Sequence, residues 1–80
     1  MKNRTIDFEI TNHIGTLSTA NSGWTKELNE VSWNGGTPKY DLRDWSPDHT
    51  NCGKGNCLSP FELVKLFEIL KTVYGDDERK

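Results

Sequence analysis

Three stretches of the chain alternate between apolar and polar residues, which is the pattern of half-buried β-strands. They cover residues 5–14, 24–33 and 38–47. Gly15 follows the first stretch and indicates a bulge or bend, because glycine inside a strand usually marks one. Asn34-Gly35 separates the second stretch from the third and predicts a tight hairpin turn, because these residue types readily adopt positive φ angles.

The alternation of the second stretch slips in its middle. Leu28 is in phase with Lys26, whereas Val31 is in phase with Trp33. If the apolar residues share one buried face, an extra residue near positions 29–30 is needed to reconcile the two halves. We therefore expect a β-bulge there, which would also bend the strand.

The third stretch has two unlike faces. Because strand side chains alternate, Tyr40 and Leu42 fall on one face, which suits a covering helix. The other face carries cations, a carboxylate and an indole, from Lys39, Asp41, Arg43 and Trp45. We expect this second face to show its indole and its cations to solvent.

The second half of the chain adds a loop, a short strand and a helix. Residues 48–54 are polar and predict a loop, and residues 55–58 predict a fourth strand at an edge of the sheet. A helix follows over about residues 59–74, and residues 76–80 form a solvated tail. The fold class is therefore α+β, a single domain over residues 1–80 with the order β-β-β-β-α.

The helix has clear start and stop signals. Ser59 is the predicted N-cap, Pro60 occupies the first helical position, and Glu62 completes a Ser-x-x-Glu capping box. Gly75 is a typical residue just past the end of a helix. These signals fix both ends of the element.

The apolar band of this helix is wider than contact with one sheet requires. The positions expected to contact a second copy of the chain are Leu63, Leu66, Phe67, Leu70, Val73 and Tyr74. Composition agrees, because a chain of 80 residues with 32% hydrophobic content can build only a lean core. Chains this short often need a metal, a disulfide or a partner subunit. We therefore expect a homodimer.

Charge and cysteine content narrow the class of protein. Ten Lys and Arg residues against twelve Asp and Glu residues give a net charge of −2, which argues against a strongly basic nucleic-acid binder. Binding to nucleic acid would need cations gathered on one face. Two cysteines give no disulfide framework, and no signal peptide or membrane-spanning segment is recognisable. We expect a cytoplasmic protein with no membrane partner.

Three tryptophans interleaved with cations favour binding of single-stranded nucleic acid, because bases stack on aromatic rings while Lys and Arg contact phosphates. The candidate binding residues are Trp24, Lys26, Trp33, Lys39, Arg43, Trp45 and Lys54. For any single indole, a place in the core is an equally good interpretation. For the whole protein, the alternative is a protein-interaction or regulatory module that uses the apolar helix or the Trp face.

A metal site and catalysis have less support. His49, Cys52 and Cys57 lie close together in sequence, but structural zinc takes four ligands, and the other histidine, His13, is far away along the chain. Two free thiols are the better interpretation, and a small zinc domain is the weaker alternative. No glycine-rich loop precedes a helix to cradle phosphate. We expect no metal, no cofactor, no small-molecule substrate and no enzymatic activity.

Several unusual short strings occur in order along the chain. They are His13-Ile14-Gly15-x-Leu17-Ser18, Ser22-Gly23-Trp24-Thr25-Lys26-Glu27-Leu28-Asn29, Val31-Ser32-Trp33-Asn34-Gly35-Gly36, Tyr40-Asp41-Leu42-Arg43-Asp44-Trp45 and Gly53-Lys54-Gly55-x-x-Leu58-Ser59. The last two strings resemble the C-terminal domain of the transcriptional positive cofactor four, and all five resemble its small bacterial, YdbC-like branch.

This resemblance implies a curved sheet, a homodimer formed through helix and sheet edges, and binding of single-stranded DNA or melted duplex with little sequence preference. Trp33 and Trp45 match stacking positions of the family, and Arg43 and Lys54 match basic positions. Trp24, Lys26 and Lys39 come only from the facing and clustering described above. The process served would be transcription, replication or repair, and RNA is an alternative ligand, because stacking does not read the 2′-hydroxyl.

Overall fold

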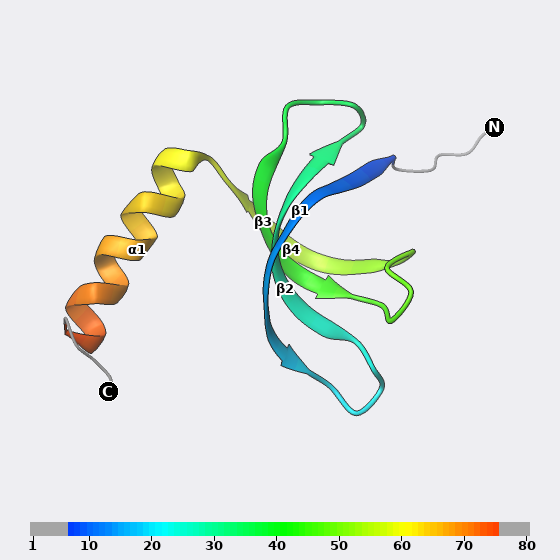
Figure 1. Ribbon diagram of the computed structural model, residues 1–80, viewed down its shortest axis with the longest axis horizontal. Helices are drawn as coiled ribbons and strands as arrows, with labels where there is room; N and C mark the ends of the chain where they lie inside the picture. Colours follow the sequence, from blue (N-terminus) through cyan, green and yellow to red (C-terminus); the bar gives the residue numbers. More distant parts are fainter. Residues whose placement is uncertain (1–6, 76–80) are drawn as a thin grey trace.

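The structure is a computed structural model and describes residues 7–75 of the chain. Four antiparallel strands form one sheet in the order β1-β2-β3-β4, and a single helix follows (Figure 1). The elements are β1 (Phe8–Thr19), β2 (Thr25–Trp33), β3 (Lys39–Trp45), β4 (Cys52–Leu58) and α1 (Pro60–Tyr74). The predicted α+β class and element order are confirmed. The predicted tail and the start of the first predicted strand lie outside the described residues.

The turn between β2 and β3 has the predicted conformation. Asn34 and Gly35 have φ angles of 53° and 75°, and the Gly36 amide donates to the Trp33 carbonyl at 2.9 Å. Two successive positive φ angles match the right-handed twist of the strands that the turn joins. The hairpin keeps β2 and β3 in regular register from Thr25 opposite Trp45 to Val31 opposite Lys39.

The bulges of the sheet lie in β1 and, where the β3–β4 pairing shifts between Arg43 and Trp45, in β4, rather than in β2. The pairing of β1 with β2 shifts between Ile10 and Asn12, between His13 and Gly15, and between Thr16 and Ser18. The irregularity predicted at Gly15 is confirmed, and the bulge predicted near residues 29–30 is wrong. β2 needs no bulge because its apolar residues do not share a face.

The two faces of the sheet differ in chemistry. We call the face that carries Val31 and Trp33 the inner face, and the opposite one the helix-side face. Leu28 lies on the helix-side face, opposite Leu42 on β3. The inner-face positions beside Val31 are polar, and they are buried: Glu27 is 3% exposed and Asn29 is fully buried. The buried face of β2 therefore carries polar residues, although the sequence predicted that its apolar residues would share that face.

The core of the described chain is small. Its buried apolar residues are Val31 and Trp45, and the buried polar ones are Glu27, Asn29, Asp41 and Ser46. Apolar burial is the main favourable term in folding, so an isolated chain with so little of it gains little stability. This finding agrees with the lean core expected from the composition.

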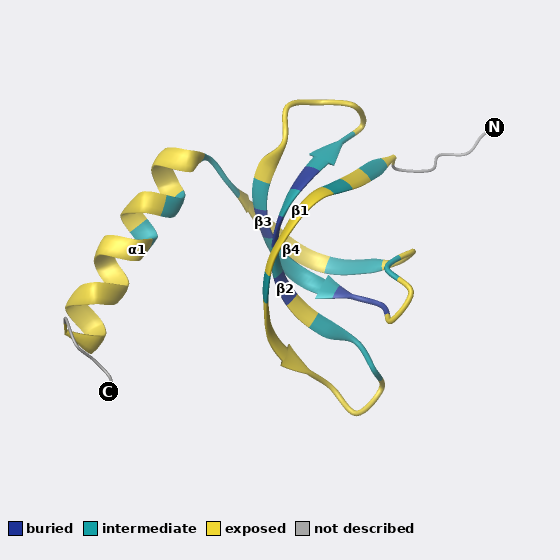
Figure 2. Cartoon of the chain, in the orientation of Figure 1, coloured by how far each residue is buried: buried dark blue, intermediate teal, exposed yellow. Residues whose placement is uncertain are grey.

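Helix α1 begins and ends as predicted, but it stands apart from the sheet (Figure 1). Ser59 Oγ accepts from the Glu62 amide at 3.1 Å, and Glu62 Oε1 accepts from the Ser59 amide at 2.8 Å, which completes the capping box. No residue of the helix is buried, and most of it is exposed (Figure 2). In the described part of the chain no helix is both long and apolar enough to cross a membrane.

Candidate nucleic-acid interface

Four rings gather at the inner face and form what we call the aromatic cluster: Phe8, Trp33, Trp45 and His49. The two indoles are nearly parallel, at 15°, with ring centroids 6.4 Å apart. Phe8 on β1 lies 5.8 Å from Trp33 and 5.1 Å from Trp45, tilted against both. His49, from the loop between β3 and β4, stacks on Trp45 at 5.9 Å and 21°.

Trp45 is completely buried, which corrects the expectation of an exposed indole. It lies on the predicted face, but the other three rings of the cluster cover it. In a protein with few apolar residues, the largest ring becomes the centre of the core. Trp45 is therefore a core residue, which was the alternative interpretation of a single indole. Its role in binding stays a prediction. Trp33 is half-buried at the edge of the cluster.

Arg43 is held on the inner face by a buried carboxylate. Its Nε donates to both oxygens of Asp41, at 2.6 Å and 2.9 Å, and Asp41 is fully buried. Burial by itself would lower the pKa of the guanidinium, but the hydrogen bond and charge of Asp41 raise it. The guanidinium carbon lies 4.6 Å from the centre of the Trp33 ring. Arg43 therefore adds a fixed cation to the aromatic cluster. Asp41 on the same strand neutralises most of its charge.

Gly55 on β4 makes room for this arrangement. It lies opposite Arg43 in the sheet, and a Cβ atom at this position would overlap the Arg43 side chain and the Leu42 carbonyl oxygen. The second glycine of the Gly-Lys-Gly string is thus needed for close approach of β4 to β3. Arg43 also donates from its Nη1 to the Gly53 carbonyl at 3.3 Å.

The predicted lysines separate onto different surfaces. Lys39 is exposed on the inner face, opposite Val31, and Lys54 is exposed on β4. Within residues 7–75 neither of them forms an ion pair. Lys26 lies on the helix-side face, where its Nζ is 3.1 Å from Asp44 Oδ1. It shares this face with Leu28, as the alternation predicted, and its role in binding stays a prediction.

Trp24 also lies away from the cluster. It precedes β2 at the end of the β1–β2 turn, where its carbonyl accepts from the Ala20 amide at 2.8 Å. It is half-buried, and within the described chain no ring-to-ring contact joins it to the aromatic cluster. The structure thus brings Trp33, Arg43 and Trp45 together and leaves Trp24 apart.

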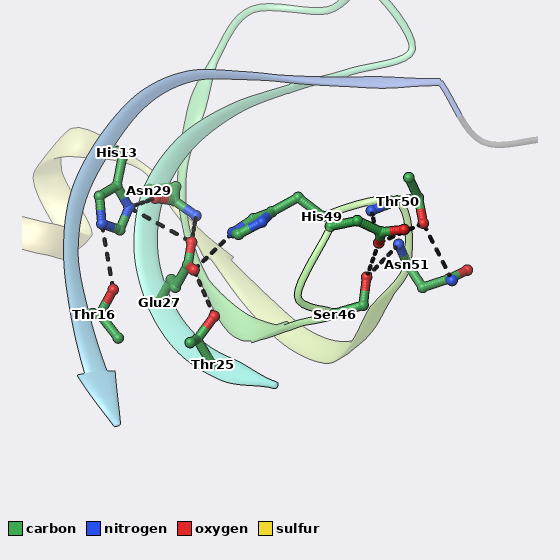
Figure 3. Close-up of polar contacts among 10 residues, drawn as sticks. His13, Thr16, Thr25, Glu27, Asn29, Ser46, His49, Thr50 and Asn51 are labelled. Carbon is green, nitrogen blue, oxygen red and sulfur yellow. Dashed lines mark hydrogen bonds and ion pairs between the residues drawn. The ribbon is translucent and has the colours of Figure 1, made fainter. Parts of the chain in front are cut away.

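A buried carboxylate organises the polar end of the inner face (Figure 3). Glu27 Oε2 accepts from Thr25 Oγ1 at 2.6 Å and lies 2.8 Å from His49 Nε2. Its Oε1 accepts from Asn29 Nδ2 at 3.0 Å and lies 3.5 Å from His13 Nδ1. Burial would raise the pKa of Glu27, but these hydrogen bonds and the charge of His49 together lower it. Glu27 is therefore held as a carboxylate between two imidazoles.

Sequence reasoning missed this polar cluster. Glu27 and Asn29 are in phase with Val31 and Trp33, so the period of two did place them on the inner face. Nothing in the sequence marked them as buried, because buried positions are usually apolar. For His49 the sequence suggested only a metal-ligand role, because the alternation of strand side chains cannot assign a loop residue to a face of the sheet.

Metal ligation has no geometric support. Among residues 7–75, no group of three or more His, Cys, Asp or Glu side chains is arranged to hold a metal ion. His49 turns to Glu27, and Cys57 Sγ donates to Asp41 Oδ2 at 3.3 Å. Burial and the Asp41 carboxylate raise the pKa of the Cys57 thiol. Cys52 and Cys57 are both free.

A second, apolar surface lies between the helix and the sheet. A hollow of about 410 Å³ is lined by Leu28, Leu63, Val64, Leu66, Phe67 and Leu70. Several of the helix positions predicted for dimer contact are open to solvent, with exposed fractions of 61% for Phe67, 65% for Val73 and 75% for Tyr74. Contiguous exposed apolar side chains are typical of surfaces through which proteins contact a partner.

The comparisons with known proteins give a relative. No protein-family model matches the chain. A protein of Treponema pallidum (strain Nichols), described as uncharacterized, is 46% identical over 69 residues, which span 86% of this chain and 81% of the relative. The chain belongs to the same family as this protein.

Proposed function

We propose that this protein binds single-stranded DNA with little sequence preference, as a homodimer and without enzymatic activity. The observation that carries the proposal is the aromatic cluster on the sheet face away from the helix, with Arg43 over Trp33 at 4.6 Å. Bases stack on such rings whatever their sequence, since every base has a π-face. Lys39 supplies an exposed cation on this face for phosphates nearby.

Ion pairs within the protein limit how many cations can contact the phosphates of DNA. Arg43 is paired with Asp41 and Lys26 with Asp44, so fewer cations are free than the sequence suggested. Stacking and a few phosphate contacts must then supply the affinity. This arrangement fits an acidic protein that recognises unpaired bases rather than one that binds duplex through many phosphates.

The dimer part of the proposal rests on the helix. Its apolar side chains are exposed, it has no buried residue, and the core of the described chain is very small. Burial of apolar area contributes roughly 25 cal/mol per Å², so covering this band would add stability that the single chain lacks. A second copy offers the same apolar band and allows a closed, two-fold arrangement. It would also bring two inner faces into one particle.

Binding is tested by titrating fluorescein-labelled oligo-dT at low salt and following its anisotropy. Trp33→Ala removes the half-buried ring beneath Arg43, and we expect it to weaken binding at least fivefold, because a stacked base is worth about 1–3 kcal/mol. Trp33→Phe keeps a ring and should bind within about threefold of the wild type.

Trp24→Ala is the matched control, since Trp24 is also half-buried but lies outside the aromatic cluster. It should bind oligo-dT as the wild type does. The proposal is wrong if the wild type shows no anisotropy change at low salt, or if it prefers a blunt duplex. A helix that captures a different protein is the alternative, and it predicts a monomer that does not bind oligo-dT.

A further inference from the structure

The stacking position expected at Trp45 has another ring in front of it. Trp45 has no exposed surface, so a base has no open face of this indole to stack on. His49 lies on Trp45 at 5.9 Å and 21°, and 39% of its side chain is exposed. At this end of the aromatic cluster, the ring that solvent reaches is the imidazole.

His49 is held in place by its side chain and by its backbone. Its Nε2 lies 2.8 Å from Glu27 Oε2, across the inner face, as Figure 3 shows. Its φ of 60° is unusual for a residue with a side chain, so the surrounding loop must maintain it. An imidazole fixed in this way loses little freedom when it stacks on a ligand.

The loop around His49 is tied by a compact set of hydrogen bonds. Asp48 Oδ1 accepts from Ser46 Oγ at 2.9 Å, from Thr50 Oγ1 at 2.8 Å and from the Thr50 amide at 3.1 Å. The Asn51 amide donates to Ser46 Oγ at 3.0 Å. The loop is thus a small, ordered turn that presents one ring toward the inner face.

Open space lies beside this ring. A hollow of about 340 Å³ is lined by Ile10, His13, Glu27 and His49. Its size falls in the range that accepts small organic groups, and it has an apolar wall as well as polar groups. A flat base stacked on the imidazole would have room here without moving Trp45.

We propose that His49 is a nucleobase-stacking residue, with the buried Trp45 as the support beneath it. This inference rests on the proposed function, and it assigns to the loop between β3 and β4 a contact that the sequence placed on the strand. Of the two imidazoles at Glu27, His49 alone belongs to the aromatic cluster. His13 lies against Asn29 Oδ1 at 2.6 Å, and its side chain is 51% exposed.

The test separates the ring from its hydrogen bond. His49→Gln keeps an N–H donor for Glu27 and removes the ring, and we expect oligo-dT binding to weaken at least fivefold. His49→Phe keeps a ring and loses the bond to Glu27, and we expect binding within about threefold of the wild type. Thermal melting of each variant shows that it is folded.

Trp24→Ala is the control, because it removes a ring that lies outside both the aromatic cluster and this hollow. It should leave oligo-dT affinity unchanged. If the wild type binds and both His49 variants bind as tightly, or both weaken equally, the stacking role is wrong while the proposed function stands. If the wild type does not bind oligo-dT at all, both the proposed function and this inference are overturned.

Discussion

Single residues on the inner face combine roles that are usually separate. Arg43 is at once an ion-pair partner of Asp41 and a cation over Trp33, so its charge is mostly used inside the protein. Trp45 gives the fold its largest buried ring. Glu27 gathers donors from β1, β2 and the β3–β4 loop, so a single carboxylate ties three segments together.

Glu27 should make stability depend on pH. Its pKa in the folded protein lies below its ordinary value of 4.5, because hydrogen bonds from Thr25, Asn29 and His49 outweigh burial. The unfolded chain therefore binds the proton more tightly. The stabilisation is present above the unfolded pKa and is lost as pH falls toward the folded one. We expect the urea midpoint to fall as the pH drops below about 5, and Glu27→Gln to reduce that fall.

The comparison needs a control that removes an equal charge elsewhere. Glu68→Gln on the exposed helix should keep the whole acid-side fall of the urea midpoint. The same loss of stability in Glu27→Gln as in the wild type would show that Glu27 does not carry the effect.

At the scale of elements, packing within one chain does not explain the wide apolar band of helix α1. Its capping box and C-terminal glycine define it locally, yet it contributes no buried residue. One side of it faces Leu28 across the apolar hollow, and the other carries polar residues such as Glu68 and Thr72. An amphipathic helix whose apolar side is uncovered is what the proposed dimer would require.

Placing one carboxylate on each side of the helix tests this interpretation. Phe67→Glu puts a charge into the apolar band, and we expect it to dissociate the dimer or to lower the melting temperature strongly, because a buried unpaired charge is costly. Thr72→Glu introduces the same group on the polar side and should have little effect. Analytical ultracentrifugation over a range of protein concentrations measures the change. A wild-type chain that stays monomeric throughout that range would contradict the dimer.

At the scale of the molecule, charge is distributed in a way that net charge does not reveal. Lys26 and Lys39 lie on neighbouring strands, but the sheet separates them onto opposite faces. Lys26 is paired with Asp44, whereas Lys39 is exposed on the inner face beside the proposed binding surface. Phosphate contacts should therefore depend on one lysine and not on the other.

The salt dependence of oligo-dT affinity measures these contacts. Lys39→Gln should reduce the slope of log affinity against log salt by about one unit, because one fewer counterion is released. Lys26→Gln removes the same charge from the helix-side face and should leave the slope unchanged. Equal slopes for both variants would mean that phosphates do not approach the inner face through Lys39.

The sequence predicted the elements well and their faces only in part. The turn at Asn34-Gly35, the capping box at Ser59 and the order of the strands follow from short-range rules, which need no tertiary contact. The bulge expected near residues 29–30 was wrong, since it assumed that Leu28 and Val31 share a buried face.

What the sequence determined by itself is the set of strands and the helix, the residue types available for stacking, and a core too lean for a large buried interior. Only the tertiary structure decided which residues are covered. Trp45 is buried and His49 is partly exposed because the β3–β4 loop folds back over the inner face, held by Glu27 on β2. Local patterns place a side chain on a face, but its exposure depends on segments that are distant in sequence.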